Sequence, residues 1–483
     1  GQNCLFSNTT AGSNTAIGFQ SLALNTTGTN NVAVGAYALD SNGTADANTA
    51  VGYSALGVNT GGESNTAVGA YCLDANISAH NNTGLGFAAL SANTTGANNT
   101  AAGYFSLGAN TSGSSNTALG KDSLRTNTTG GNNVAFGVNA LFGNTSGTQS
   151  VAIGSDALAA NTTAFYNTAV GRSALKANTT GAYNTAIGGL ALYDSTTASN
   201  NVAIGYTSLY ENTTGQYNTA VGNESLLNNT TGNYNVALGD DALKGNLTGD
   251  NNIAIGHAAL DGNTIGDDNT AVGIHTLGAN TIGVGNVGVG RQALTSNTSA
   301  NYNTAIGRSA IRLNTTGTAL VAVGYEALYD NTTASHITAI GARALKSNTT
   351  GAQNTACGAY ALDAVTTTSN NTAVGYFALG AHTGNNCTAV GNKALQLSTT
   401  AERCNAFGSA SLDANTTGGD NNAFGTGSLG SNTTGSNNTA FGGSSLSANT
   451  TASNSTAVGK SALEANTTGE RNVAVGANAL DAN

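Results

Sequence analysis

The sequence is built from one 17-residue repeat that is copied along its whole length. Asn48 begins the repeat NTAVGYSALGVNTGGES, and Asn65 begins the next copy. Counting from Asn14 gives 28 copies, of which one, starting at Asn371, has 16 residues. A short fixed period predicts a solenoid in which each repeat is one coil. We therefore expect residues 1–483 to form a single continuous array rather than several globular domains.

The same positions of successive repeats are strongly restricted, and we refer to each set of equivalent positions as a column. Column 5 is Gly in all 28 repeats, and column 9 is Leu in 27, with Ile311 as the exception. Column 3 is Ala in 26 repeats and is replaced by Gly84 and Gly288. Column 1 is Asn in 22 repeats and column 12 is Asn in 24. Such restriction predicts that each side chain meets its own copy one layer away.

The order of residues within a repeat predicts short strands. Columns 1 to 5 read as a strand, followed by a turn at the Gly, a second extended piece around the Leu, and a polar corner such as Asn-Thr-Thr-Gly. Column 2 is Thr in 17 repeats and Val in eight, and these residues favour strands. The frequent Gly and Asn-Thr-Thr exclude helices. The expected fold class is all-β: a parallel β-solenoid, or β-roll, of about 28 coils spaced about 4.8 Å apart.

Four columns have an expected structural role. The Gly of column 5 marks either a positive φ or a contact too close for a Cβ atom. The Leu of column 9 fills the inside of the coil. The Asn columns form ladders, in which each amide bonds its neighbours and caps the adjoining turn.

The first strand of each repeat is apolar on both faces. Columns 2 and 4 point one way and column 3 the other, and none of the three is charged. Strands of this kind are usually buried on both faces, but a thin coil has only one interior. An exposed apolar stripe of this length would exceed what soluble monomers tolerate. We therefore expect identical chains to associate, as a trimer or a filament.

Composition excludes several other partners. Charged residues make up 8% of the chain and the net charge is −10, so there is no basic stripe for nucleic acid. No stretch of about 18 apolar residues predicts a membrane span. Neither end carries the polar capping repeat of a free-standing solenoid, so we expect the array, without caps, to be part of a longer fibre.

No catalytic, cofactor-binding or metal-binding site is predicted, and no cofactor is expected. The five histidines fall in different columns and are expected to be exposed or in turns: His80, His257, His275, His336 and His382. Several aspartates follow the Leu and are expected to form a solvated edge: Asp40, Asp74, Asp261, Asp363 and Asp413. They lack the GGxGxDxU pattern of calcium-binding solenoids.

Tyrosines and cysteines leave alternatives open. Tyrosines in the last column could bind host or cell-surface glycans, but cross-coil packing is favoured: Tyr166, Tyr183, Tyr217, Tyr234 and Tyr302. Cys387 and Cys404 occupy one column of successive repeats, which permits a disulfide, although burial in place of Asn is favoured. The Asn-Thr-Thr strings match the N-glycosylation signal, but crowding on neighbouring coils predicts few occupied sites.

Short strings of the sequence resemble two groups of fibrous proteins. Ser150–Gly154 (SVAIG), Asn201–Gly205 (NVAIG) and Asn472–Gly476 (NVAVG) resemble the head-domain repeats of trimeric autotransporter adhesins. The full repeat Asn218–Tyr234 resembles the arrays of phage tail-fibre proteins and bacterial surface proteins, which often precede an intramolecular chaperone. The adhesin resemblance implies a left-handed β-roll of three intertwined chains displayed outside the cell. This chain has a period of 17 residues rather than 14, and it contains no recognisable anchor, stalk or chaperone domain.

These observations predict a non-enzymatic, extracellular structural fibre or adhesin shaft, on a cell-surface appendage or a virion. A phage tail-fibre shaft that carries host recognition elsewhere is the alternative. An ice-binding solenoid is disfavoured because Val replaces Thr in nearly a third of column 2. A catalytic β-helix is disfavoured because no cluster of carboxylates or long irregular loop interrupts the array.

Overall fold

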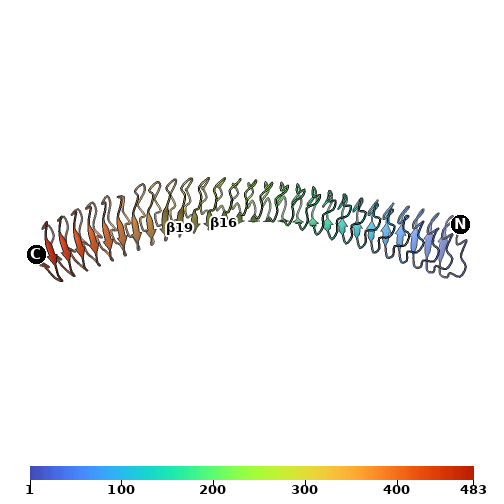
Figure 1. Ribbon diagram of the computed structural model, residues 1–483, viewed down its shortest axis with the longest axis horizontal. Coiled ribbons are helices and arrows are strands. Elements are labelled where there is room, and N and C mark those ends of the chain that lie inside the picture. The colour runs from blue at the N-terminus through green and yellow to red at the C-terminus, as the bar shows by residue number, and fades with distance from the viewer. Residues whose placement is uncertain (483) are drawn as a thin grey trace. The chain divides into compact units, whose positions relative to one another are not determined.

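The computed structural model describes residues 1–482 and divides into two compact units, Gly1–Asp241 and Ala242–Asn483. Within each unit the chain winds into stacked coils, with one short strand per repeat (Figure 1). The described residues contain no helix. The predicted parallel β-solenoid with 17-residue coils is therefore confirmed.

Unit 1 contains fourteen strands among its described residues, and each pairs in parallel with the next along the chain. The register is offset by one repeat, so that Ala16 lies opposite Ala33. The strands are β1 (Thr15–Ile17), β2 (Val32–Val34), β3 (Thr49–Val51), β4 (Thr66–Val68), β5 (Thr83–Leu85), β6 (Thr100–Ala102), β7 (Thr117–Leu119), β8 (Val134–Phe136), β9 (Val151–Ile153), β10 (Thr168–Val170), β11 (Thr185–Ile187), β12 (Val202–Ile204), β13 (Thr219–Val221) and β14 (Val236–Leu238).

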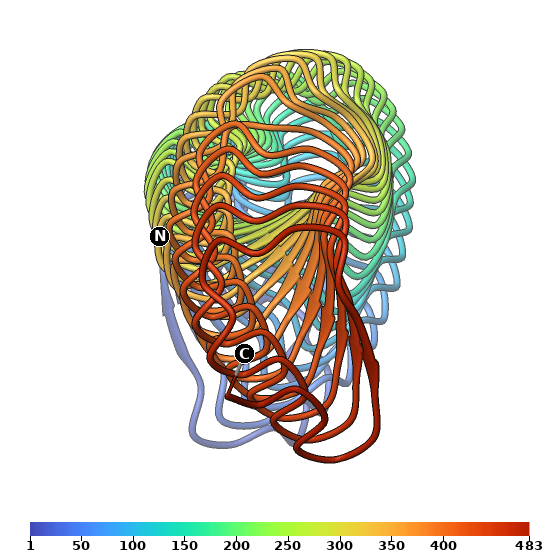
Figure 2. The same cartoon turned by 90° about the vertical axis from the view of Figure 1, so that its left-hand side faces the viewer.

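Unit 2 repeats this organisation with fourteen strands among residues 242–482. The register is the same, with Ala254 opposite Ala271. The strands are β15 (Ile253–Ile255), β16 (Thr270–Val272), β17 (Val287–Val289), β18 (Thr304–Ile306), β19 (Leu320–Val323), β20 (Ile337–Ile340), β21 (Thr355–Cys357), β22 (Thr372–Val374), β23 (Thr388–Val390), β24 (Asn405–Phe407), β25 (Asn422–Phe424), β26 (Thr439–Phe441), β27 (Thr456–Val458) and β28 (Val473–Val475). In Figure 2 the red coils at the end of this unit lie one in front of another, with their strands along a common side.

The strands are shorter than predicted. They cover columns 2 to 4 rather than 1 to 5, except in β19 and β20, where Leu320 and Ile337 replace Asn and extend the strand by one residue. Column 3 points into the coil and is buried, whereas columns 2 and 4 point outwards and are partly exposed, as in β4. The predicted alternation of faces is therefore confirmed.

The predicted second extended piece around the Leu is wrong. The chain turns through columns 6 to 11, and columns 7 and 9 adopt left-handed backbone angles, as at Tyr37 (φ 61°) and Leu39 (φ 51°). Two left-handed residues turn the chain sharply and aim the Leu side chain inwards. Leu39 is fully buried, as is the rest of its column in the inner coils. The gain from burying Leu offsets the cost of the unusual backbone, about 1–2 kcal/mol per residue.

Both reasons proposed for the invariant Gly hold. Gly52 has a φ of 140°, and a Cβ atom there would lie 2.5 Å from the carbonyl oxygen of Gly69 in the next coil. Side chains rarely adopt this backbone angle, and a real Cβ never comes so close to an oxygen. The column therefore accepts only Gly.

Both Asn columns are buried; column 12 forms the predicted ladder of amide-to-amide hydrogen bonds, whereas the amides of column 1 mainly bond the backbone of neighbouring coils. In column 12, Asn42 donates to the Oδ1 of Asn25 (2.9 Å) and to the carbonyl of Ala45 (3.0 Å). In column 1, the Asn48 amide donates to the carbonyl of Gly62 (2.9 Å), while the Oδ1 of Asn31 accepts the backbone N–H of Asn48 (2.9 Å). These side chains are fully buried, so the Asn of the Asn-Thr-Thr corners in the inner coils is not accessible for glycosylation, whereas Asn8 in the partial repeat at the start is exposed.

The two exceptions in the Ala column have a packing explanation. A Cβ added to Gly84 would lie 2.4 Å from the Sγ of Cys72, and one added to Gly288 would lie 2.6 Å from the Cγ2 of Thr276. Cys72 and Thr276 both occupy column 8 of the preceding coil, where most repeats have Ala or Ser. A larger side chain in column 8 thus requires the loss of a methyl group in column 3 of the next coil.

This pairing predicts a compensating double mutant. Gly84→Ala alone should destabilise unit 1 by about 1–3 kcal/mol, because the new methyl group overlaps the Cys72 sulfur. Cys72→Ala in the same chain should recover most of that loss, because it restores the common Ala–Ala pair. Urea unfolding of both single variants and the double variant measures the coupling. Additive effects would contradict the pairing.

Candidate functional site

The sequence predicts that the histidines are exposed or in turns, and this prediction is wrong for one of the five. His80, His257, His275 and His336 are exposed, but His382 is fully buried. His382 replaces Asn in column 12 of the 16-residue repeat, directly before the shortened corner. Its Nδ1 lies 3.0 Å from the Oγ of Ser398, and its Nε2 has no hydrogen-bond partner.

Burial lowers the pKa of His382 to about 4, compared with an ordinary value of 6.5. Between pH 6.5 and 4 the His382 ring is protonated in the unfolded chain but neutral in the folded chain, so the free energy of unfolding falls as the pH drops through this range. The full loss is about 3 kcal/mol for a shift of this size. His382→Asn should remove this part of the pH dependence. Urea unfolding of unit 2 between pH 7 and 4 measures it, and an unchanged slope in the variant would contradict the assignment.

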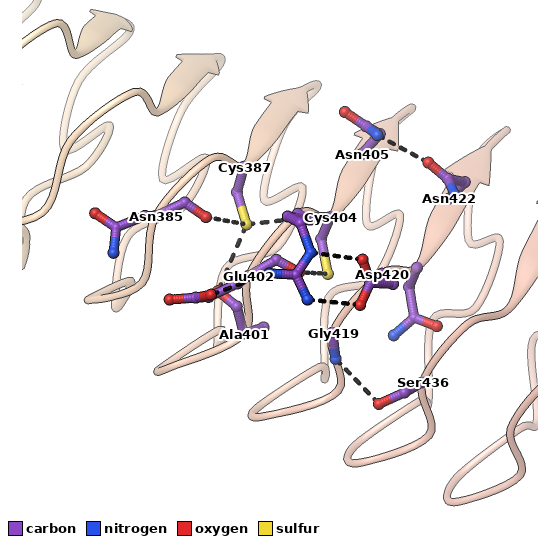
Figure 3. Close-up of polar contacts among 12 residues, drawn as sticks. Asn385, Cys387, Ala401, Glu402, Cys404, Asn405, Gly419, Asp420, Asn422 and Ser436 are labelled. Atoms are coloured by element: carbon purple, nitrogen blue, oxygen red, sulfur yellow. Dashed lines mark hydrogen bonds and ion pairs between the residues drawn. The ribbon is translucent and has the colours of Figure 1, made fainter.

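Cys387 and Cys404 are stacked and buried free thiols (Figure 3). They take over the hydrogen bonds of the Asn they replace in column 1. The Sγ of Cys404 donates to the carbonyl of Gly418 (3.3 Å), and the Sγ of Cys387 accepts the backbone N–H of Cys404 (3.4 Å). The hydrogen bond with Cys404, together with burial, raises the pKa of the Cys387 thiol, so this thiol is not activated as a nucleophile.

The aspartates after the Leu do not form a fully solvated edge, contrary to expectation. They lie half-buried among the turns, and burial raises the pKa of Asp40, Asp74, Asp363 and Asp413. The Oδ1 atoms of Asp74, Asp363 and Asp413 are buried without a hydrogen-bond partner. Carboxylates in this state gain from any cation or donor that reaches them.

Four of the last-column tyrosines stack across coils, which confirms the packing that the sequence analysis favours for them. Tyr166 and Tyr183 have ring centroids 5.3 Å apart, and Tyr217 and Tyr234 have theirs 4.9 Å apart with planes 1° from parallel. Tyr302 has no such partner in the next repeat and is 69% exposed.

A longer aromatic array in unit 1 was not predicted. We term it the aromatic ladder; it alternates between columns 6 and 7 and comprises Phe19, Tyr37, Tyr53, Tyr71, Phe87, Tyr104 and Phe105. Ring centroids in neighbouring coils lie 5.3 to 5.8 Å apart, mostly edge to face. Because neither column is aromatic throughout, a search column by column misses the ladder. Reading columns 6 and 7 together would have revealed it.

A hollow of about 330 Å³ lies along this ladder. It is lined by Tyr37, Asp40, Ser41, Tyr53, Ser54, Gly57, Val58, Tyr71 and Asp74. Gly57 occupies column 10 between Asp40 and Asp74, and the missing side chain leaves the space open. Tyr53 is 47% exposed and Tyr71 is 41% exposed, so part of each ring faces solvent. The hollow thus combines three phenol rings with two carboxylates.

Elsewhere in the chain the same kind of turn holds a cation of its own. The Arg125 guanidinium lies 4.9 Å from the centre of the Phe105 ring, at one end of the ladder. In unit 2, Arg308 lies over Tyr325 (5.7 Å) and Arg343 over Tyr360 (5.9 Å). Aromatic rings of these turns therefore attract positive charge through their faces.

Comparisons with known proteins give no family for this chain. No protein-family model matches the sequence, and no curated protein matches it significantly. Within residues 1–482 no helix has the length and apolar character needed to cross a membrane.

Proposed function

We propose that this chain is a non-enzymatic structural shaft, in which stacked coils form the rod and identical chains associate through the outer face of the sheet. The outer face is the observation that carries the proposal. In β4, β5, β7 and β9 the side chains of Val68, Leu85, Leu119 and Ile153 are 38–43% exposed. No charged residue occurs in columns 2 and 4 of any repeat.

A second copy of the chain is the occupant that fits this face best. The apolar stripe repeats at every coil, so a partner with the same spacing matches it along its length. Another copy has that spacing. A single globular partner would cover only a few coils and leave most of the stripe in water.

The interior of the coil supports a mechanical role. Within each unit, successive coils are tied together by backbone hydrogen bonds beyond the strands, such as Leu22 to Ala38 (3.0 Å) and Thr26 to Gly43 (2.8 Å), and by the Asn ladders. This repeated bonding favours a stiff rod. The low charge and the resemblance to fibre repeats favour an extracellular position, as part of an adhesin or a phage tail fibre.

Light scattering coupled to size-exclusion chromatography tests the association. The folded chain should have a mass that is a multiple of 47.3 kDa. Val68→Lys combined with Leu85→Lys places two charges on the outer face and should reduce the mass or weaken the association. Thr95→Lys combined with Ser112→Lys, at exposed corners of neighbouring coils, should have no effect. A folded wild-type chain that stays at 47.3 kDa overturns the proposal.

A further inference from the structure

The tetrapeptide Tyr-x-Leu-Asp occurs three times in the chain and places a ring and a carboxylate on the same turn. The copies are Tyr37–Asp40, Tyr71–Asp74 and Tyr360–Asp363. The Leu is buried in each copy. The Tyr and the Asp stay partly exposed, on either side of the residue that fills the core.

In the third copy the chain supplies its own cations. Arg343 lies over the Tyr360 ring. Both Arg343 and Lys346 form ion pairs with Glu326, and the Lys346 Nζ lies 2.8 Å from the Glu326 Oε2. Burial raises the pKa of Asp363, and the positive charges of Lys346 and Arg343 oppose that rise. This copy is therefore a cation site that the chain itself occupies.

The first two copies have no cation of their own. They lie two coils apart, with Tyr53 between them, and line the same hollow. The first 120 residues contain four acidic side chains, Asp40, Asp46, Glu63 and Asp74, and no Lys or Arg. The Oδ1 of Asp74 is buried without a hydrogen-bond partner, and the Oδ1 of Asp40 accepts a long hydrogen bond from the Ser41 hydroxyl, at 3.4 Å.

We propose that the hollow between Tyr37 and Tyr71 binds an organic cation, an alkylammonium or guanidinium group supplied from outside the chain. Ring faces and carboxylates attract such a group together, since the rings stabilise the charge at a site that is partly shielded from water. A metal ion is disfavoured because the phenol rings offer no strong ligand and the hollow has only two carboxylates, which lie in different coils.

The spacing of the carboxylates suggests a ligand with more than one charge. Two coils of a parallel stack span about 10 Å, so Asp40 and Asp74 lie at the two ends of the hollow. A flexible diamine or triamine can place one ammonium group at each carboxylate and its methylene chain against Tyr53. The inference does not depend on the self-association proposed above, because the hollow lies in the turns and not on the strands.

Isothermal titration of the full-length chain tests the inference. The probes are spermidine, as a free polyamine, and a blocked Lys-Gly-Lys peptide, as a basic protein segment. Spermidine should bind one equivalent per chain. Tighter binding of the peptide would instead identify a protein segment as the source of the cation. Absence of binding by both probes overturns the proposal.

Three variants separate a specific site from general attraction to an acidic surface. Asp40→Asn combined with Asp74→Asn should weaken binding by about tenfold or more, the effect expected for losing two partly shielded charges. Gly57→Leu fills the hollow, keeps every charge and ring, and should also abolish binding. Asp46→Asn combined with Glu63→Gln removes two charges from corners of nearby coils and should leave affinity within about twofold, since neither carboxylate lines the hollow.

If Asp46→Asn with Glu63→Gln weakened binding as much as Asp40→Asn with Asp74→Asn, the proposal would be overturned in favour of a diffuse electrostatic effect. Circular dichroism of each variant confirms that the fold is retained. The mass of each variant should equal that of the wild type, so that failure of the self-association proposal and failure of the cation site remain distinguishable.

Discussion

Asn127→Asp should destabilise unit 1 by about 4 kcal/mol at pH 7, although it changes a single NH₂ group to an oxygen. The Asn127 amide is fully buried and donates to the Oδ1 of Asn110 (2.8 Å) and to the carbonyl of Gly130 (2.9 Å). Its own Oδ1 accepts from Asn144 (2.7 Å). The introduced carboxylate cannot donate, so it would face two acceptors and bury a charge.

The loss should depend on pH in a defined direction. Burial and the neighbouring acceptors would raise the pKa of the introduced carboxyl above its unfolded value of about 3.9. The penalty is then complete above the raised value and disappears as the pH falls to the unfolded value. Urea unfolding followed by circular dichroism at pH 7 and pH 4 measures the change relative to the wild type.

Asn132→Asp is the matched control for this substitution. Asn132 is exposed, lies in the last column of the same repeat and has a left-handed φ of 59°, which Asp tolerates as well as Asn does. We expect a change below about 0.5 kcal/mol. Equal losses of unfolding free energy in the two variants would show that the ladder does not stabilise the coil in the way described. A loss for Asn127→Asp that is the same at pH 7 and pH 4 would show this as well.

The columns that contact their own copies could be predicted from the sequence, and the turns between them could not. The Gly, Ala, Leu and Asn columns vary little because each meets an identical residue in the next coil. The left-handed angles at Tyr37 and Leu39 were missed because neither residue favours a positive φ, and only the burial of Leu39 compensates for it.

The hollow in unit 1 was missed for a different reason. It depends on residues from three coils: the missing side chain of Gly57 exposes space beside Asp40 and Asp74, which lie in other repeats. The column of these aspartates predicts a solvated edge, since that column alone gives no sign of the rings beside them. His382 is buried because it lies in column 12, where Val365 of a full-length repeat is buried as well; the expectation of an exposed ring treated the histidine apart from its column.

Gly52→Ala should destabilise unit 1 by about 4 kcal/mol, the sum of backbone strain and steric overlap. The φ of Gly52 is 140°, and the new Cβ would lie 2.5 Å from the Gly69 carbonyl oxygen and 2.6 Å from its carbon. Neither atom can move without breaking the hydrogen bonds of the next coil. Hydrogen exchange measured by mass spectrometry should show faster exchange on both sides of position 52.

Gly61→Ala is the control, because a Cβ at Gly61 meets no atom within 4 Å and the φ there is not positive. It should leave stability unchanged or raise it by up to about 1 kcal/mol, because Ala restricts the unfolded chain. The contrast distinguishes two kinds of positive φ in one coil. Angles near 55°, as at Ser54 (φ 51°) and Leu56 (φ 52°), accept ordinary side chains at a moderate cost. The angle of Gly52 does not, so a tolerated Gly52→Ala would mean that the stacked coils are not held at the close spacing on which the ladders and the sheet depend.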